Sequence, residues 1–131
     1  MMYREPSDSP WGLVVRCDTL CPGVYSVSTA GHGGIMVQID AARRLLSPEA
    51  QTVGFQAGGY LNFEEDCDAS VALRELMDSG IIAPRTDNYF RPGEYEACID
   101  RSLQHWNPAY WQARQERLSV REAKAAKERE R

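Results

Sequence analysis

The chain has 131 residues, of which 43% are hydrophobic and 26% are charged, and its formal net charge is −4. These values are typical of one ordinary domain that can bury a core without disulfide or metal staples. No stretch approaches the roughly 20 apolar residues of a membrane span, and the first residues lack the apolar run of a signal peptide. We therefore expect a cytoplasmic protein that does not bind membranes.

The charge is divided unevenly along the chain. Residues 112–131 carry seven basic and four acidic side chains, a net charge of +3, which leaves −7 on residues 1–111. Binding to nucleic acid requires clustered Lys and Arg to neutralise phosphates, so an acidic body argues against direct contact with DNA or RNA. The same charge favours a protein partner with a basic surface.

The four cysteines, Cys17, Cys21, Cys67 and Cys98, are spaced too widely for a CxxC pair, and in the cytoplasm they should stay reduced. Cys17 and Cys21 could supply two zinc ligands, but a structural zinc site needs four and no second close pair exists. We therefore predict neither a metal site nor a cofactor. Free cysteines often behave as small core hydrophobes, and we expect this of Cys98.

The N-terminal half predicts a small antiparallel sheet. Residues 1–10 form a polar arm that contains Pro6 and Pro10, and the single ordered domain is expected over residues 11–111. Residues 13–17, 24–28 and 35–39 are short runs rich in β-branched residues. A Cys-Pro-Gly break at residues 21–23 and a glycine cluster at residues 31–34 separate them. We predict a three-stranded meander whose second connection is residues 31–34.

Helical patterns follow the strands. Residues 41–46 suggest one or two turns after Asp40, and residues 60–63 are either a short strand or the approach to a helix. Asn62 and Glu65 have the spacing of a capping box and Gly80 suits a helix C-terminus, so we predict a helix over residues 62–79. Its apolar stripe contains Ala69, Ala72, Leu73, Leu76 and Met77, and leaves Cys67 and Val71 outside.

A second helix should start near Pro92 and pack on the sheet, before Asn107-Pro108 interrupts it. A further helix then runs into the charged extension of residues 112–131. The expected fold class is α+β, a small antiparallel β-meander packed against two or three helices around one core. The residues predicted to be buried are Trp11, Val14, Val24, Val27, Ile35, Val37, Leu73, Leu76, Ile99, Leu103 and Trp106.

The most distinctive segment is residues 28–34, Ser-Thr-Ala-Gly-His-Gly-Gly, which places His32 inside a glycine cluster. Glycines allow left-handed backbone conformations and close approach, which both hairpin tips and ligand sites require. The only other histidine, His105, lies near the end of the second predicted helix, and we expect it to be structural.

An acidic run, Glu64-Glu65-Asp66-Cys67-Asp68, precedes the apolar stripe of the predicted helix. Carboxylates in a first helical turn complement the positive end of the helix dipole, and this interpretation is favoured. The alternative is chemistry, with His32 as general acid or base, Cys67 or Ser28 as nucleophile, and Glu65 or Asp66 orienting the imidazole. The adjacent carboxylates would oppose ionisation of the Cys67 thiol.

Several of these segments together resemble a known pattern. They are Trp11-Gly12, residues 22–24, residues 28–35, residues 63–68 and residues 106–108. The combination resembles an uncharacterised domain family of plasmid- and phage-associated proteins, over roughly residues 10–111. The resemblance carries no catalytic residues. It implies a mobile genetic element as context, and thus an anti-defence role such as inhibition of a CRISPR or restriction system.

Two hypotheses follow. In the first, the chain binds a host or defence-system protein through an acidic surface made of Glu64, Glu65, Asp66 and Asp68 together with His32, because charge complementarity steers such encounters. In the second, the chain is a small hydrolase or transferase that uses His32 with Cys67 or Ser28. The enzyme requires the hairpin tip and the acidic run to lie within hydrogen-bonding reach.

Overall fold

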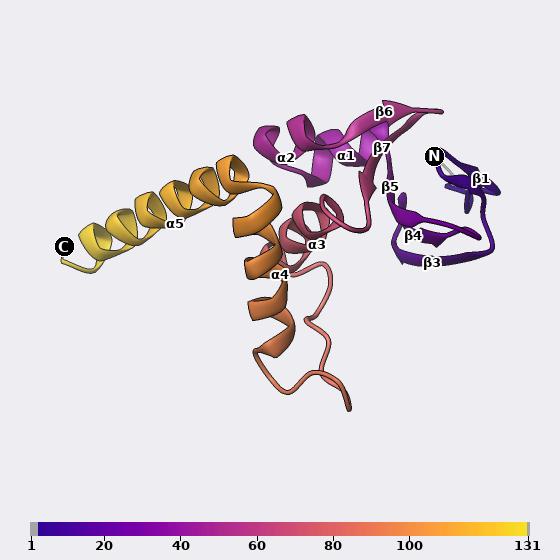
Figure 1. Ribbon diagram of the computed structural model, residues 1–131. Helices are drawn as coiled ribbons and strands as arrows, with labels where there is room; N and C mark the ends of the chain where they lie inside the picture. The colour runs from indigo at the N-terminus through magenta and orange to yellow at the C-terminus, as the bar shows by residue number, and fades with distance from the viewer. Residues whose placement is uncertain (1–2, 131) are drawn as a thin grey trace.

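The computed structural model describes residues 3–130, and its fold is α+β, as predicted. A five-stranded antiparallel sheet has the order β3-β4-β5-β7-β6, and a separate pair, β1-β2, precedes it in the chain. The strands are β1 (Asp8–Ser9), β2 (Gly12–Leu13), β3 (Arg16–Cys21), β4 (Val24–Ser28), β5 (Gly33–Gln38), β6 (Phe55–Ala57) and β7 (Tyr60–Glu64). The helices are α1 (Ile39–Leu45), α2 (Pro48–Val53), α3 (Ala69–Asp78), α4 (Glu94–Trp106) and α5 (Pro108–Arg129). Figure 1 shows the sheet on one side of the molecule and α3 to α5 on the other.

The predicted meander is present as β3-β4-β5, with several differences in its limits, including a β5 that begins at Gly33 rather than at residue 35. The first strand begins at Arg16 rather than at residue 13, and Leu13 and Val15 are 76% and 75% exposed. The break between β3 and β4 shrinks to Pro22-Gly23, where Gly23 has a φ of +87° that side chains rarely adopt. The segment around Cys21 thus continues the strand instead of ending it.

The predicted helix start at Asn62 is wrong, because this residue lies in the middle of β7 and is fully buried. Its Nδ2 donates to the carbonyl oxygens of Phe55, Ala57 and Tyr60 at 3.1, 3.4 and 3.2 Å, which closes the β6–β7 hairpin. The helix α3 begins only at Ala69. Pairing of β7 with two neighbouring strands therefore overrides a local pattern that favoured helix capping.

The later helices largely follow the predicted limits. Gly80 ends α3 with a φ of +72°, and Asn107-Pro108 separates α4 from α5. Val71, expected outside the apolar stripe, is fully buried, because α3 packs against the sheet, α2 and α4 at once. The main contacts of α4 are with α3 and α5 rather than with the sheet.

The core consists of two clusters instead of the single one predicted, because apolar side chains cover both faces of the sheet. The larger cluster packs the helices against Val24, Ile35, Val37, Leu61 and Phe63. The smaller cluster, Tyr25, Val27 and Met36, lies on the opposite face under partly buried residues that include Trp11 and Val14.

Most residues predicted to be buried are buried, and the exceptions have local causes. Trp11, Val14 and Leu73 are half-buried at the edges of the clusters. Trp106 is 54% exposed and Cys98 is also exposed, so both predictions are wrong. Trp106 lies at the end of α4, where it lines a shallow pocket together with residues of α2 and α5.

The start of α5 is tied to the body by buried polar groups. Arg114 makes a bidentate ion pair with Asp78 at 2.7 and 2.9 Å, and Tyr110 donates to the buried carboxylate of Glu75 at 2.6 Å. Arg117 also pairs with Glu75 at 3.4 Å, and the C-terminal part of the helix projects away from the other elements (Figure 1). None of the helices within residues 3–130 has the length and apolar content needed to cross a membrane.

Candidate functional site

The loop that carries His32 is held by one threonine. Thr29 Oγ1 donates to the His32 carbonyl oxygen at 2.5 Å and accepts from the His32 amide at 3.1 Å. The Thr29 amide donates to the same carbonyl at 2.8 Å. The connection between β4 and β5 is therefore residues 29–32, and β5 already begins at Gly33.

Gly33 and Gly34, which follow His32, serve close packing rather than left-handed conformations. Gly31, Gly33 and Gly34 are absent from the glycines with positive φ, so that part of the prediction is wrong. A Cβ added to Gly34 would lie 2.5 Å from the Trp11 ring, and one added to Gly33 would lie 3.0 Å from Glu65 Oε2. Both positions thus lack room for a side chain, and Gly33 lies directly under the Glu65 carboxylate.

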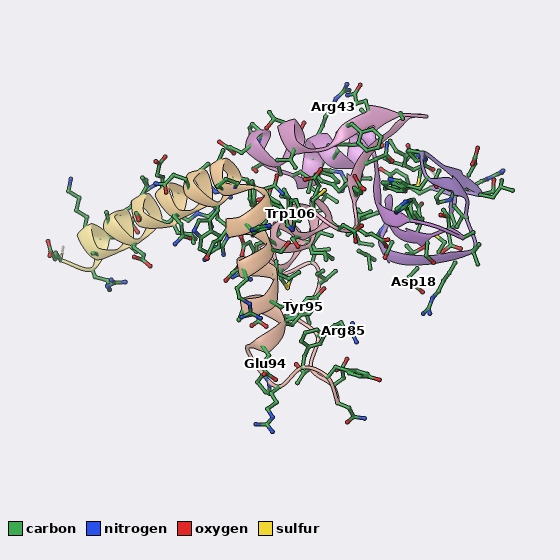
Figure 2. The ribbon with its side chains drawn as sticks, in the orientation of Figure 1. Asp18, Arg43, Arg85, Glu94, Tyr95 and Trp106 are labelled. Atoms are coloured by element: carbon green, nitrogen blue, oxygen red, sulfur yellow. The ribbon has the colours of Figure 1, made fainter. Side chains whose placement is uncertain are left out.

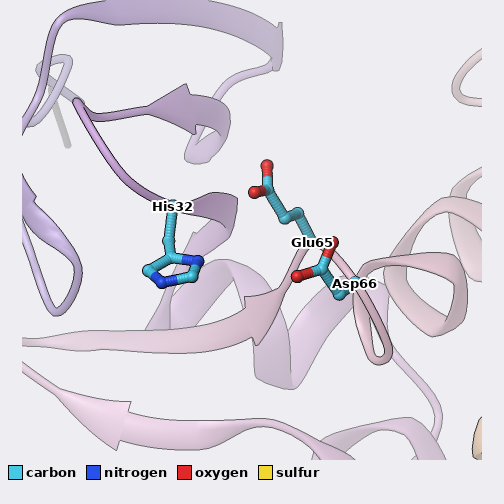
Figure 3. Close-up of side chains that lie close together, drawn as sticks. All are labelled: His32, Glu65 and Asp66. Carbon is cyan, nitrogen blue, oxygen red and sulfur yellow. The ribbon is translucent and has the colours of Figure 1, made fainter.

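The hairpin tip and the acidic run meet. Pairing of β5 with β7 places Gly34 opposite Glu64, and the Glu65 amide donates to the Gly33 carbonyl at 3.1 Å. One ligand atom from each of His32, Glu65 and Asp66 lies within 4.8 Å of the others (Figure 3). All three residues are exposed. We call this group the His-Glu-Asp cluster.

The helix-dipole interpretation of the acidic run is wrong. No acidic residue lies in the first turn of α3, and Asp68 occupies the N-cap position without a side-chain capping bond. Glu65 and Asp66 precede the helix in a turn, and their side chains make no hydrogen bond or ion pair with any residue in the range 3–130. Their presence is therefore not explained by stabilisation of a helix end.

The other residues of the run are engaged within the protein. Cys67 Sγ lies 4.0 Å from Glu64 Oε2, and both residues are half-buried. Burial, followed by the charges of Asp68 and Glu64, raises the pKa of the Cys67 thiol, so the nucleophilic thiolate is disfavoured. Asn107 Nδ2 donates to the Cys67 carbonyl at 3.0 Å and to Asp68 Oδ1 at 3.2 Å. Asp68 thus has a structural partner that the sequence did not predict.

Ser28 is the last residue of β4 and is half-buried. Its backbone pairs with Gly33 on one side and Arg16 on the other. This hydroxyl therefore belongs to the residue directly before the loop that carries His32. Among the described residues, no other side chain donates a hydrogen bond to it or accepts one from it.

A groove of about 500 Å³ lies beside the cluster, between the sheet and the segment that follows α3. Glu65 and Asp18 line it from the sheet side, and Arg85 and Tyr95 line it from the segment and from α4; Figure 2 labels three of these residues. Its apolar lining is Leu20, Val27, Ile35, Ala69, Leu73, Ile82 and Ala83. The Arg85 guanidinium pairs with Asp87 at 2.8 Å, so the uncompensated charge at the rim is negative on the Glu65 side.

Of the charged and aromatic residues that line the groove, the sequence indicated only Glu65 as a site residue. Asp18 follows the predicted first strand, residues 13–17, and lies within the observed β3; nothing in its neighbours marks it. Asn107 was noted as a helix breaker within the Trp-Asn-Pro motif, and this motif was the one available signal for its contact with the acidic run.

Comparison with known proteins identifies a family whose description assigns no function. A family model described as a domain of unknown function, DUF7007, matches residues 4–131. The match includes the charged extension, which the resemblance over residues 10–111 had left out. No curated protein and no solved structure matches the chain.

Proposed function

Because this chain belongs to the DUF7007 family, whose description assigns no activity, we propose a function from the geometry of the site. The chain is a binding protein, and its acidic surface engages a basic segment of another protein. The observation that carries this proposal is that Glu65, which lines an apolar groove, and the adjoining Asp66 are both exposed and unpaired within residues 3–130.

Charge and shape support the proposal together. Apolar grooves with a few charged groups at the rim suit the binding of a side chain or a short segment, because the apolar lining supplies contact and the charges supply orientation. Two unpaired carboxylates, Glu65 in the groove lining and Asp66 next to it in the chain, attract a Lys or Arg that enters the groove, and they also steer the encounter. Of the four carboxylates in the sequence hypothesis, Glu65 and Asp66 are therefore the contacts, whereas Asp68 holds Asn107.

The partner that fits is a host protein whose own surface is basic, as the surfaces of nucleic-acid-binding proteins are. In the context of a mobile genetic element, which the motif pattern implies, such a partner would be a component of a CRISPR or restriction system in the host cytoplasm. The chain would then act as an anti-defence inhibitor that covers a nucleic-acid-binding surface, without contacting nucleic acid or a membrane itself.

Charge reversal tests this proposal. A fluorescent lysine-rich peptide and a host lysate would be offered to the wild-type protein and to Glu65→Lys/Asp66→Lys. The double variant should bind the peptide about tenfold more weakly, a loss of about 1.4 kcal/mol, since exposed charge pairs each contribute a fraction of this. It should also lose the captured partner while keeping the circular dichroism spectrum and thermal midpoint of the wild type.

The matched control is Glu122→Lys/Glu128→Lys, which makes the same change of net charge on the exposed part of α5. Binding should persist in this control and should weaken with salt, because the carboxylates are exposed. Equal losses in both double variants would show that net charge alone drives binding, and unchanged binding in Glu65→Lys/Asp66→Lys would remove the acidic site from the proposal.

The same convergence of side chains supports a second candidate, a small hydrolase or transferase. A carboxylate within reach of His32 could orient its imidazole as a general base. The raised pKa of Cys67 opposes its use as a nucleophile and leaves Ser28 for this role. Under this candidate, His32→Ala abolishes turnover of activated esters while His105→Ala does not. Under the binding proposal, His32→Ala retains the captured partner.

A further inference from the structure

We propose that the His-Glu-Asp cluster is an open binding site for a divalent transition-metal ion, with Zn²⁺ as the best-fitting ion. The sequence predicted no metal site, because the only ligands evident from its spacing were Cys17 and Cys21, which are too few for a structural zinc site. The structure instead brings together an imidazole and two carboxylates from segments 33 positions apart, His32 on one side and Glu65 with Asp66 on the other. Neither the family nor the proposed binding function assigns a metal to these residues.

The spacing of the ligand atoms is close to what an ion requires. Zn²⁺ binds imidazole nitrogen and carboxylate oxygen at about 2.0–2.2 Å, which places neighbouring ligand atoms about 3–3.5 Å apart. The three atoms already lie within 4.8 Å of one another. The side chains therefore need to close by an ångström or so, which rotation about exposed side-chain bonds achieves.

Nothing else in the described part of the chain competes for these ligand atoms. The side chains of His32, Glu65 and Asp66 make no hydrogen bond or ion pair with any residue in the range 3–130. An ion would thus replace water on all three groups without breaking a protein contact. Two exposed carboxylates that are held close together also repel each other, and a divalent cation removes this repulsion.

The backbone that carries the ligands is already fixed. Both the amide and the carbonyl of His32 bond to Thr29, and Glu65 bonds through its amide to Gly33, the residue next to His32. Binding an ion therefore orders three side chains but no backbone, and this preorganisation lowers the entropic cost of the site.

The kinds of ligand atom select the ion and the character of the site. Imidazole favours Zn²⁺ and its neighbours over Mg²⁺ and Ca²⁺, which prefer oxygen ligands alone. Three protein ligands leave a coordination position for water or for a group of a bound molecule, as in zinc sites that are not purely structural. Glu65 also lines the groove, so that position is accessible to a molecule bound there.

Calorimetric titration of the purified protein with Zn²⁺ tests the site. The wild type should bind one equivalent of Zn²⁺. His32→Ala and Glu65→Gln/Asp66→Asn should each lower the Zn²⁺ affinity at least about tenfold, because even the loss of a residue that only supports a metal ligand has an effect of this size. His105→Ala removes the other histidine and should bind as the wild type does. Cys17→Ser/Cys21→Ser should also retain binding, because these thiols are outside the site.

Equal Zn²⁺ affinity in the wild type and His32→Ala, loss of binding in Cys17→Ser/Cys21→Ser, or no binding by the wild type would each overturn the proposal. Mn²⁺ in an NMR titration gives an independent location: it should broaden the amide signals of residues 31–34 and 64–66 first, and broadening elsewhere first would count against this site. Because the titrations contain no peptide or partner, their failure leaves the peptide-binding result intact, and failure of peptide binding leaves the titrations intact.

Discussion

Replacement of Asn107 tests how the acidic run is held. Its Nδ2 donates to the Cys67 carbonyl at 3.0 Å and to Asp68 Oδ1 at 3.2 Å, across 40 and 39 positions of the chain. A hydrogen bond to a neutral carbonyl is worth about 1 kcal/mol, and one to a carboxylate about 1.5–3 kcal/mol. Because Asn107 and Asp68 are only half-buried, we discount the sum and expect Asn107→Ala to lower the free energy of unfolding by about 2 kcal/mol.

The assay is urea denaturation at neutral pH, followed by circular dichroism. A chain of this size loses about 4 °C of thermal midpoint per kcal/mol, so Asn107→Ala should melt about 8 °C lower. The m-value should be unchanged, because the unfolded state is the same. Asn107→Asp keeps the shape but places a second carboxylate against Asp68, so it should be less stable than the alanine variant.

The matched control is Asn88→Ala, at an exposed loop position where the asparagine side chain makes no hydrogen bond with any residue in the range 3–130. This variant should stay within about 0.5 kcal/mol of the wild type. If Asn107→Ala is as stable as Asn88→Ala, or if Asn107→Asp is more stable than Asn107→Ala, the two hydrogen bonds do not hold the acidic run in solution.

Two further predictions follow from packing and charge. Gly34→Ala should destabilise the protein by about 1–3 kcal/mol in the same denaturation assay, because its Cβ would lie 2.5 Å from the Trp11 ring. Gly31→Ala should be nearly neutral, because its Cβ would have no neighbour within 4 Å. Equal effects of the two substitutions would contradict the close packing at Gly34. Cys67 should be alkylated by iodoacetamide more slowly than exposed Cys98 at pH 7.5, because its raised pKa lowers the fraction of thiolate. The pH dependence of its alkylation rate should have a midpoint above the ordinary thiol pKa of 9.0. Peptide mapping that finds Cys67 modified first would refute this.

The part of the fold that could be predicted is the part whose signals are local. Val24 to Ser28 is a short run rich in β-branched and aromatic residues, and Pro22-Gly23 before it has the chemistry of a tight turn. Gly80 and Asn107-Pro108 likewise mark helix ends through their own backbone preferences. Such residues constrain φ and ψ whatever surrounds them, so sequence alone was sufficient.

Residues around Asn62 show where local signals fail. Its spacing from Glu65 matches a capping box, yet an asparagine can also satisfy the carbonyl groups of a hairpin, and here it does so for Phe55, Ala57 and Tyr60. The choice depends on whether β5 and β6 lie alongside, which local spacing does not encode. The exposure of Trp106 also could not be predicted locally, because it depends on how α4 packs against the other helices.

The residues of the candidate site could be predicted from the sequence, but their position relative to the strands and helices could not. The residue types in the His-Glu-Asp cluster were singled out, but the misplaced helix start made the dipole interpretation of the acidic run appear sufficient. Once β7 continues to Glu64, the carboxylates at Glu65 and Asp66 no longer lie in a first turn, and the explanation by helix stabilisation is lost. Whether the acidic run stabilises a helix end or forms an exposed site therefore depends on where α3 begins, to within a few residues.

The cluster depends on the register of β5 against β7 rather than on any local motif. Successive strand residues point to opposite faces, so a shift of one residue would carry Glu65 to the face covered by Trp11 and bring Glu64 towards the groove. Ile35 opposite Phe63 and Val37 opposite Leu61 prevent this shift, because all four side chains are buried in the larger cluster. The apolar pairs that stabilise the fold are therefore also what brings a carboxylate to the histidine.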